Sequence, residues 1–157
     1  MSTRHYDVET FTSANSIGYL LKLSHSLMHE AASAAFAGHD VSFIQWIVLT
    51  KLREGTLNAS DLCRTMRYDN GALTRLLDQL EARGYVERER SQADRRVVEL
   101  RLTPAGRRKV TQLMPLLVDC LNSSLASFSK AEFSELVRLL DKLIAGLHAP
   151  RQDPDAG

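Results

Sequence analysis

The side chains best suited to chemistry lie together on one predicted helix, over residues 70–83. Its polar face carries Asn70, Gly71, Thr74 and Arg75, and leucines occupy the opposite face. Amide, hydroxyl and guanidinium groups hydrogen-bond the base edges and phosphates of nucleic acids. Gly71 has no side chain, so it permits a close approach of the backbone to a partner. This face therefore indicates binding chemistry rather than catalysis.

Two helices joined by a short turn are predicted to position these groups. Asn58 can cap the first helix, reinforced by Asp61 in its first turn. Asp69 can cap the second helix, and Gly84 can end it in the left-handed conformation that glycine adopts easily. Spacings of 0, +3, +4 and +7 give the second helix one apolar side, made of Leu73, Leu76, Leu77 and Leu80. This order of elements is typical of a helix-turn-helix, whose second helix lies in the major groove of DNA.

An arginine-tipped β-hairpin is predicted to follow. Residues 85–88 and 97–102 alternate apolar and charged side chains, as half-buried strands do. The loop between them ends in Asp94, Arg95 and Arg96, and we expect Asp94 to pair with one of the two arginines. Guanidinium groups at such a tip fit the narrow minor groove, where the negative potential attracts them.

These motifs, taken in order, resemble those of the MarR family of winged helix-turn-helix regulators. The resemblance is carried by DNGALTR at 69–75, DQLE at 78–81, GYVER at 84–88, DRR at 94–96 and LRLTPAG at 100–106. It covers roughly residues 15–148. It implies a mainly α fold with a small β-hairpin wing, comprising a winged helix-turn-helix lobe and a helical dimerisation lobe.

The resemblance also implies which residues contact double-stranded DNA. The expected set is Ser60, Arg64, Asn70, Gly71, Thr74, Arg75, Asp94, Arg95 and Arg96. Residues of the second helix would enter the major groove, the wing arginines would enter the minor groove, and Ser60 and Arg64 would touch phosphates. We expect Asp78 to pair with Arg75 or a neighbouring arginine and to contact no base.

A homodimer is predicted from the helices outside this lobe, because they carry more apolar surface than one chain could easily hide. Two recognition helices would then read a palindromic operator, with half-sites about one helical turn, roughly 34 Å, apart. The expected segments are a flexible arm at 1–10, a single domain at 11–148 and a disordered tail at 149–157. Within that domain, 42–103 is expected to bind DNA, and 11–37 and 104–148 to form the dimer.

The family resemblance further implies regulation by a small-molecule effector, such as a phenolic or aromatic compound. In the family, such molecules bind in a crevice between the dimerisation helices and the DNA-binding lobe. The candidate contacts by position are His25, Met28, His29, Trp46, Leu113 and Leu117. Trp46 and the two leucines could equally belong to the core.

The distribution of charge agrees with DNA as the partner. The 157 residues carry a net charge of +1, but residues 51–110 hold 14 Lys and Arg against 9 Asp and Glu. We find no phosphate-binding loop, nucleophile elbow or spacing of paired metal ligands, so neither an enzyme nor a cofactor is expected. No signal peptide and no apolar run of membrane-spanning length are recognised, so we expect a cytoplasmic protein without a membrane partner.

Two alternatives stay open at this point. A winged helix can serve as a protein-interaction module without a DNA target. A regulator could instead sense a metal or a thiol oxidant: His25 and His29 share one helical face, and the chain has two cysteines, Cys63 and Cys120. No further ligand completes a metal site locally. Cys63 is better explained as a small buried residue.

Overall fold

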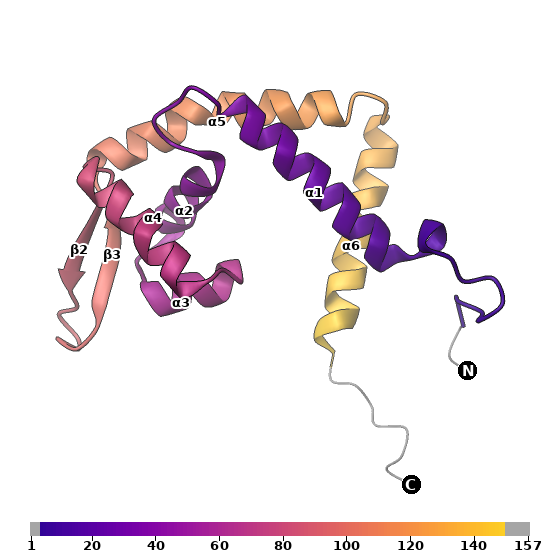
Figure 1. Ribbon diagram of the computed structural model, residues 1–157, viewed down its shortest axis with the longest axis horizontal. Coiled ribbons are helices and arrows are strands. Elements are labelled where there is room, and N and C mark those ends of the chain that lie inside the picture. Colours follow the sequence, from indigo (N-terminus) through magenta and orange to yellow (C-terminus); the bar gives the residue numbers. More distant parts are fainter. Residues whose placement is uncertain (1–3, 150–157) are drawn as a thin grey trace, which may run out of the picture. The chain divides into compact units, whose positions relative to one another are not determined.

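The computed structural model describes residues 4–149, in a mainly helical chain with one small sheet (Figure 1). The helices are α1 (Ile17–Ala35), α2 (Phe43–Glu54), α3 (Ala59–Met66), α4 (Asn70–Ala82), α5 (Pro104–Ser124) and α6 (Lys130–His148). The strands are β1 (Leu57–Asn58), β2 (Val86–Arg90) and β3 (Val98–Leu102). Two compact units are distinguished, with the division after Leu121. The predicted fold class, mainly α with a winged helix-turn-helix, is confirmed.

Side-chain caps set the start of most helices, including the two of the helix-turn-helix. Ser42, Asn58, Asp69 and Ser129 each accept a hydrogen bond from an amide in the first turn of α2, α3, α4 and α6, respectively. Such bonds satisfy amides that have no partner within the helix. The predicted caps at Asn58 and Asp69 are confirmed, so the sequence itself defines where the two helices of the helix-turn-helix begin.

The wing is part of a three-stranded antiparallel sheet with the order β1-β3-β2. Val86 faces Leu102 and Arg88 faces Leu100 across the hairpin, whereas β1 adds Leu57 opposite Leu100. The first strand was predicted to end at Arg88 but continues to Arg90. The third strand, β1, was not predicted, because two residues carry no readable alternation.

The core of the first unit lies between α2, α3, α4, the sheet and the start of α5. The leucine stripe of α4 is buried as predicted, at Leu73, Leu76, Leu77 and Leu80. Trp46 of α2 is also buried, and its Nε1 donates to the carbonyl oxygen of Val110 at 3.2 Å. This core holds α4 firmly by one side and leaves its polar face outward.

The base of the wing is joined to α5 by an unusually close backbone approach. The Thr103 hydroxyl donates to the carbonyl oxygen of Gly84 at 2.6 Å and accepts from the Gly106 amide at 3.0 Å. A Cβ atom at Gly106 would lie 2.1 Å from the Tyr85 carbonyl oxygen. No side chain fits there, so glycine at 106 is what allows α5 to pack against the first residues of the wing.

Helices α1 and α6 bury little within one chain. Ala32 is the single buried residue of α1, and α6 has none among its described residues. Large apolar side chains are instead exposed on both, among them Ile17, Leu20, Leu27, Phe133, Leu139 and Ile144. Within residues 4–149, no helix combines the length and apolarity needed to cross a bilayer.

The two chain ends are described only in part. Residues 1–3 of the predicted arm and 150–157 of the predicted tail lie outside the described range. Within the arm, the Tyr6 hydroxyl accepts from the Ile17 amide at 2.9 Å, and the Tyr6 and Phe11 rings meet edge to face. This contact adds an N-terminal hydrogen bond to α1.

Candidate nucleic-acid interface

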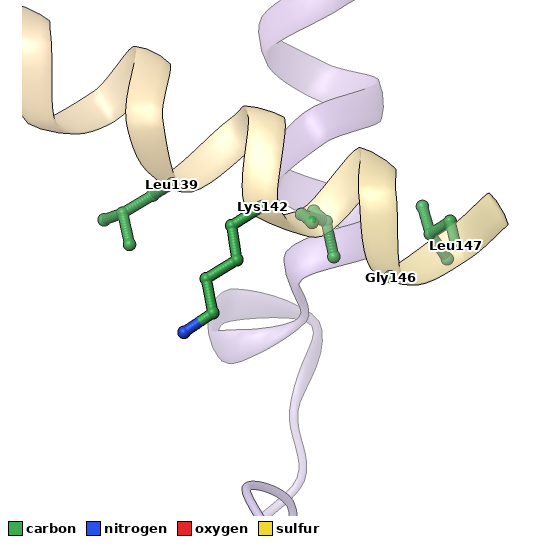
Figure 2. Close-up of a pocket in the computed structure, with 5 residues that line it drawn as sticks. Leu139, Lys142, Gly146 and Leu147 are labelled. Carbon is green, nitrogen blue, oxygen red and sulfur yellow. The ribbon is translucent and has the colours of Figure 1, made fainter. Parts of the chain in front are cut away.

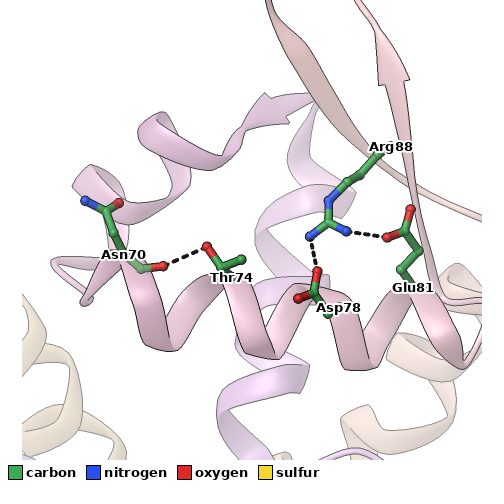
Figure 3. A network of polar contacts seen from close by, with 5 residues as sticks. All are labelled: Asn70, Thr74, Asp78, Glu81 and Arg88. Atoms are coloured by element: carbon green, nitrogen blue, oxygen red, sulfur yellow. Dashed lines mark hydrogen bonds and ion pairs between the residues drawn. The ribbon is translucent and has the colours of Figure 1, made fainter.

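The N-terminal half of α4 presents all four side chains and backbone positions predicted for the major groove. Asn70, Gly71, Thr74 and Arg75 are exposed. The Thr74 hydroxyl donates to the Asn70 carbonyl oxygen at 2.9 Å, while the Asn70 amide projects away from the helix (Figure 3). No hydrogen bond or ion pair involves the Arg75 guanidinium within the described part of the chain, so its donors are available to a partner.

The two residues predicted to touch phosphates both lie on helix α3, and one of them already has a partner. Ser60 is exposed. Arg64 is exposed too, but its Nη2 donates to Asp61 Oδ1 at 2.6 Å. Because this pair is on the surface, it is weak, and a phosphate could take the place of the carboxylate.

The tip of the wing is shaped by backbone hydrogen bonds. Asp94 Oδ1 accepts from the Arg96 amide at 2.9 Å, and the Asp94 carbonyl accepts from Val97 at 2.9 Å. The expected pairing of the Asp94 carboxylate with an arginine side chain is absent from the structure over residues 4–149. Arg95 and Arg96 are exposed there without an acidic partner, so both guanidinium groups can meet a phosphate or a groove.

Arg88 joins the wing to α4. Its Nη2 donates to Asp78 Oδ1 at 2.7 Å, and its Nη1 bonds Glu81 (Figure 3). Of the partners expected for Asp78, Arg75 is not the one used; the carboxylate pairs with another arginine, Arg88 of β2. Burial acts to lower the pKa of Arg88, but the bonds and charges of Asp78 and Glu81 outweigh it and raise that pKa.

A second polar cluster ties the base of the wing to the loop before α2 and to α5. The Tyr85 hydroxyl donates to Asp40 Oδ2, and Lys109 Nζ lies 3.1 Å from Asp40 Oδ1. The hydrogen bond from Tyr85 lowers the pKa of Asp40, with Lys109 adding to the effect and partial burial opposing it. Lys109 also lies 5.4 Å from the centre of the Tyr85 ring, a cation–π contact.

A shallow groove of about 300 Å³ runs beside α4 on the side of α2. Its lining comprises Ser42, Ile44, Gln45, Tyr68, Ala72, Arg75, Leu76 and Gln79. Gln45 is buried and donates to Gln79 Oε1 at 2.7 Å, while Arg83 donates to Gln45 Oε1 at 3.0 Å. None of the residues predicted to contact an effector lines this groove.

The predicted effector residues are spread over the core and the surface. Trp46 and Leu113 are buried, Leu117 is half-buried, and His25, Met28 and His29 are exposed on α1. The effector site therefore stays a prediction.

The residues considered for sensing have local partners. The His25 and His29 rings are 6.1 Å apart, and His29 meets the edge of Phe43. No group of three His, Cys, Asp or Glu suited to a metal occurs between residues 4 and 149. Cys63 is a buried free thiol whose Sγ donates to the Tyr68 carbonyl at 3.1 Å, as its interpretation as a small core residue predicts.

Comparison with known proteins identifies this arrangement. The sequence profile of the MarR family matches residues 39–97. The regulator MgrA of Staphylococcus aureus is 31% identical over 116 residues, covering 72% of this chain and 76% of MgrA. The chain belongs to the MarR family. The transcriptional repressor MprA of Escherichia coli is 29% identical over 115 residues, covering 73% of this chain, and the match spans 65% of MprA.

Solved structures of similar proteins agree with the assignment. A mutant of Escherichia coli MarR complexed with operator DNA superposes with a TM-score of 0.73 at 26% identity, covering 85% of this chain and 97% of that one. Bordetella bronchiseptica BpsR gives a TM-score of 0.74 at 25% identity, covering 85% and 96%. The DNA binding of BpsR is regulated by 6-hydroxynicotinic acid. The relatives are transcriptional regulators, which points away from an enzyme.

Proposed function

We propose that this MarR-family chain is a transcriptional repressor that binds a palindromic operator as a homodimer and is released by a small molecule. The observation that carries the proposal is the pairing of an exposed polar face on α4 with a wing tip holding two unpaired arginines. Both surfaces project from a single lobe. Their chemistry matches base edges in the major groove and the negative potential of the minor groove.

The contacts divide into positioning and reading. Ser60, Arg64 and the wing arginines would bind sugar–phosphate or the minor groove, and so fix the lobe on the duplex. Asn70 and Arg75 carry the groups that pair with adenine and guanine, respectively. Thr74 has its hydroxyl hydrogen directed to the helix backbone, which leaves its methyl group to contact thymine.

Homodimerisation is supported by the uncovered apolar faces of α1 and α6. On α6, Leu139, Leu143 and Leu147 border an open hollow of about 470 Å³ together with Lys142 and Gly146 (Figure 2). Contiguous apolar surface of this kind marks an interaction site in a soluble protein. A second copy of the chain is the partner that a two-fold palindromic operator requires.

An effector is proposed by analogy with BpsR, whose DNA binding responds to an aromatic acid. Such a ligand can release DNA only by binding the DNA-free conformation more tightly, and DNA must then weaken the ligand equally. The candidate residues on α1, His25, Met28 and His29, are exposed and so accessible to it.

The decisive experiment measures binding to the DNA upstream of the protein's own gene across a salt series, with and without salicylate. Tight binding that falls steeply with salt and weakens with salicylate supports the whole proposal. Tight binding that salicylate does not change would support the repressor but contradict an effector of this class. Binding without salt dependence, or equal to that of random DNA, favours the protein-interaction alternative.

Sedimentation of the same sample tests the dimer independently. We expect a two-chain species, and Leu139→Lys should shift it toward the monomer. Asp141→Lys, at an exposed position of the same helix outside this hollow, serves as the control and should leave the dimer intact. A wild-type protein that sediments as a monomer while binding one half-site would contradict the proposed two-fold mode.

A further inference from the structure

The turn between α3 and α4 has a left-handed backbone at Arg67, a residue type that is unusual in this conformation. Arg67 has φ 49° and ψ 47°, in the left-handed region. It is the one non-glycine residue with a positive φ among residues 4–149. Side chains with a Cβ rarely adopt this conformation, because the Cβ crowds the following carbonyl.

The turn itself is held by other groups. The Tyr68 amide donates to the Cys63 carbonyl at 3.1 Å, and the Cys63 thiol returns a bond to the Tyr68 carbonyl at 3.1 Å. Arg67 contributes its backbone amide, which bonds the Arg64 carbonyl at 3.3 Å. A glycine or asparagine would provide the same backbone bond with less strain.

The Arg67 side chain has no function within the described part of the chain. It is exposed, and no hydrogen bond or ion pair involves its guanidinium there. The nearby acids are engaged elsewhere: Asp61 bonds Arg64 at 2.6 Å, and Asp69 caps α4 through the Ala72 amide at 2.8 Å. A strained position that holds a charged side chain without an internal partner indicates a role outside the chain.

The place of Arg67 defines what that partner can be. Three peptide units separate it from Asn70, so their Cα atoms are at most about 11 Å apart. The major groove is about 12 Å wide. When the start of α4 lies in that groove, a side chain this close to it borders the groove, where the sugar–phosphate backbone runs.

We propose that Arg67 binds a DNA phosphate beside the recognition helix, an inference that rests on the proposed function. The left-handed turn directs the backbone into α4 and leaves the guanidinium free at the groove edge. An arginine there neutralises a phosphate and releases counterions, whatever the base sequence.

The test compares Arg67→Gly, Arg67→Asn and Arg67→Lys on two probes: the upstream DNA and a duplex of mixed sequence and equal length. Loss of one phosphate contact weakens binding about fivefold per subunit at 0.15 M salt and reduces the salt slope by about one per subunit. We expect this loss for the glycine and asparagine variants on both probes. The lysine variant should keep the slope.

Thermal stability and DNA affinity should change in opposite directions in the glycine variant. Glycine relieves the left-handed strain, so Arg67→Gly should melt at or above the wild-type temperature while binding DNA more weakly. Arg108→Gln removes an exposed arginine elsewhere, at the start of α5, and should change neither slope nor melting temperature.

The possible outcomes distinguish a failure of the proposed function from a failure of the role given to Arg67. Wild-type protein without salt-dependent DNA binding would overturn the proposed function itself. Wild-type binding that Arg67→Gly and Arg67→Asn leave unchanged would overturn only the role of Arg67. A melting temperature several degrees lower for Arg67→Gly would show that the arginine is there for folding, and would overturn the inference as well.

Discussion

Arg88 of the wing and Asp78 of the recognition helix form an ion pair of 2.7 Å, the contact that joins the two predicted DNA-binding elements. The Arg88 side chain is 29% exposed, against 57% for Asp78. The guanidinium also bonds Glu81, one helical turn further along α4. One side chain therefore links the wing to two acidic positions on α4.

Arg88→Ala should lower both stability and DNA affinity. The acids of this cluster are solvent-accessible, so the loss in the free energy of unfolding should not exceed about 1 kcal/mol. The loss in affinity should be larger, because the wing arginines would no longer be held beside the groove. Urea unfolding and DNA titration measure the two effects.

Arg101→Ala is the matched control for Arg88, since Arg101 pairs with Glu89 and Glu99 inside the sheet and does not reach α4. A double-mutant cycle with Asp78→Asn should show clear coupling to Arg88. Equal affinity losses for the two arginine variants would contradict the positioning role of Arg88.

Arg75→Ala should cost about 1–3 kcal/mol of operator binding and relax base preference at one position, if the guanidinium reads guanine. Selection of bound sequences from a random pool measures the preference. An equal loss on every sequence would instead identify Arg75 as a phosphate contact.

Arg96→Ala should weaken operator binding while leaving the dimer intact, since its side chain lies at the wing tip and makes no hydrogen bond or ion pair with the rest of residues 4–149. The effect should be greatest on operators whose flanks are rich in A·T, where the minor groove is narrow. Affinity equal to wild type on all flanks would remove the wing from the mechanism.

Asp40→Asn should make stability less sensitive to acid. The pKa of Asp40 lies below its ordinary value of 3.8, because Tyr85 and Lys109 bond the ionised carboxylate. The contribution of ionised Asp40 to the free energy of unfolding is therefore full above pH 3.8 and is lost as the pH falls through the lowered pKa. Melting curves from about pH 6 to pH 3 should converge for the two proteins. A difference in melting temperature between the two proteins that stays constant over this pH range would contradict the assignment.

The sequence predicts well what short-range chemistry decides. Asn58 and Asp69 cap the helices as expected, because a cap involves groups only three residues apart. The leucine stripe of α4 follows from periodicity alone. The exposed face with Asn70 and Arg75 is then the necessary opposite side of that helix.

Contacts between distant segments were beyond sequence reasoning. The partner of Asp78 proved to be Arg88, ten residues away and on a strand. The sequence indicated Arg75 or a neighbouring arginine, but only the register and twist of the hairpin decide which arginine lies beside Asp78. Arg67 was missed because a left-handed residue is usually recognised by glycine or asparagine.

The close approach of Gly106 to the Tyr85 carbonyl has a mechanical consequence. With no room between them, the first turn of α5 and the base of β2 must move together. A wing strand of five residues is about 17 Å long, so a rotation of about 10° at that junction would displace the arginine tip by about 3 Å. Such a displacement equals the length of a hydrogen bond, enough to break the minor-groove contacts that we propose for Arg95 and Arg96.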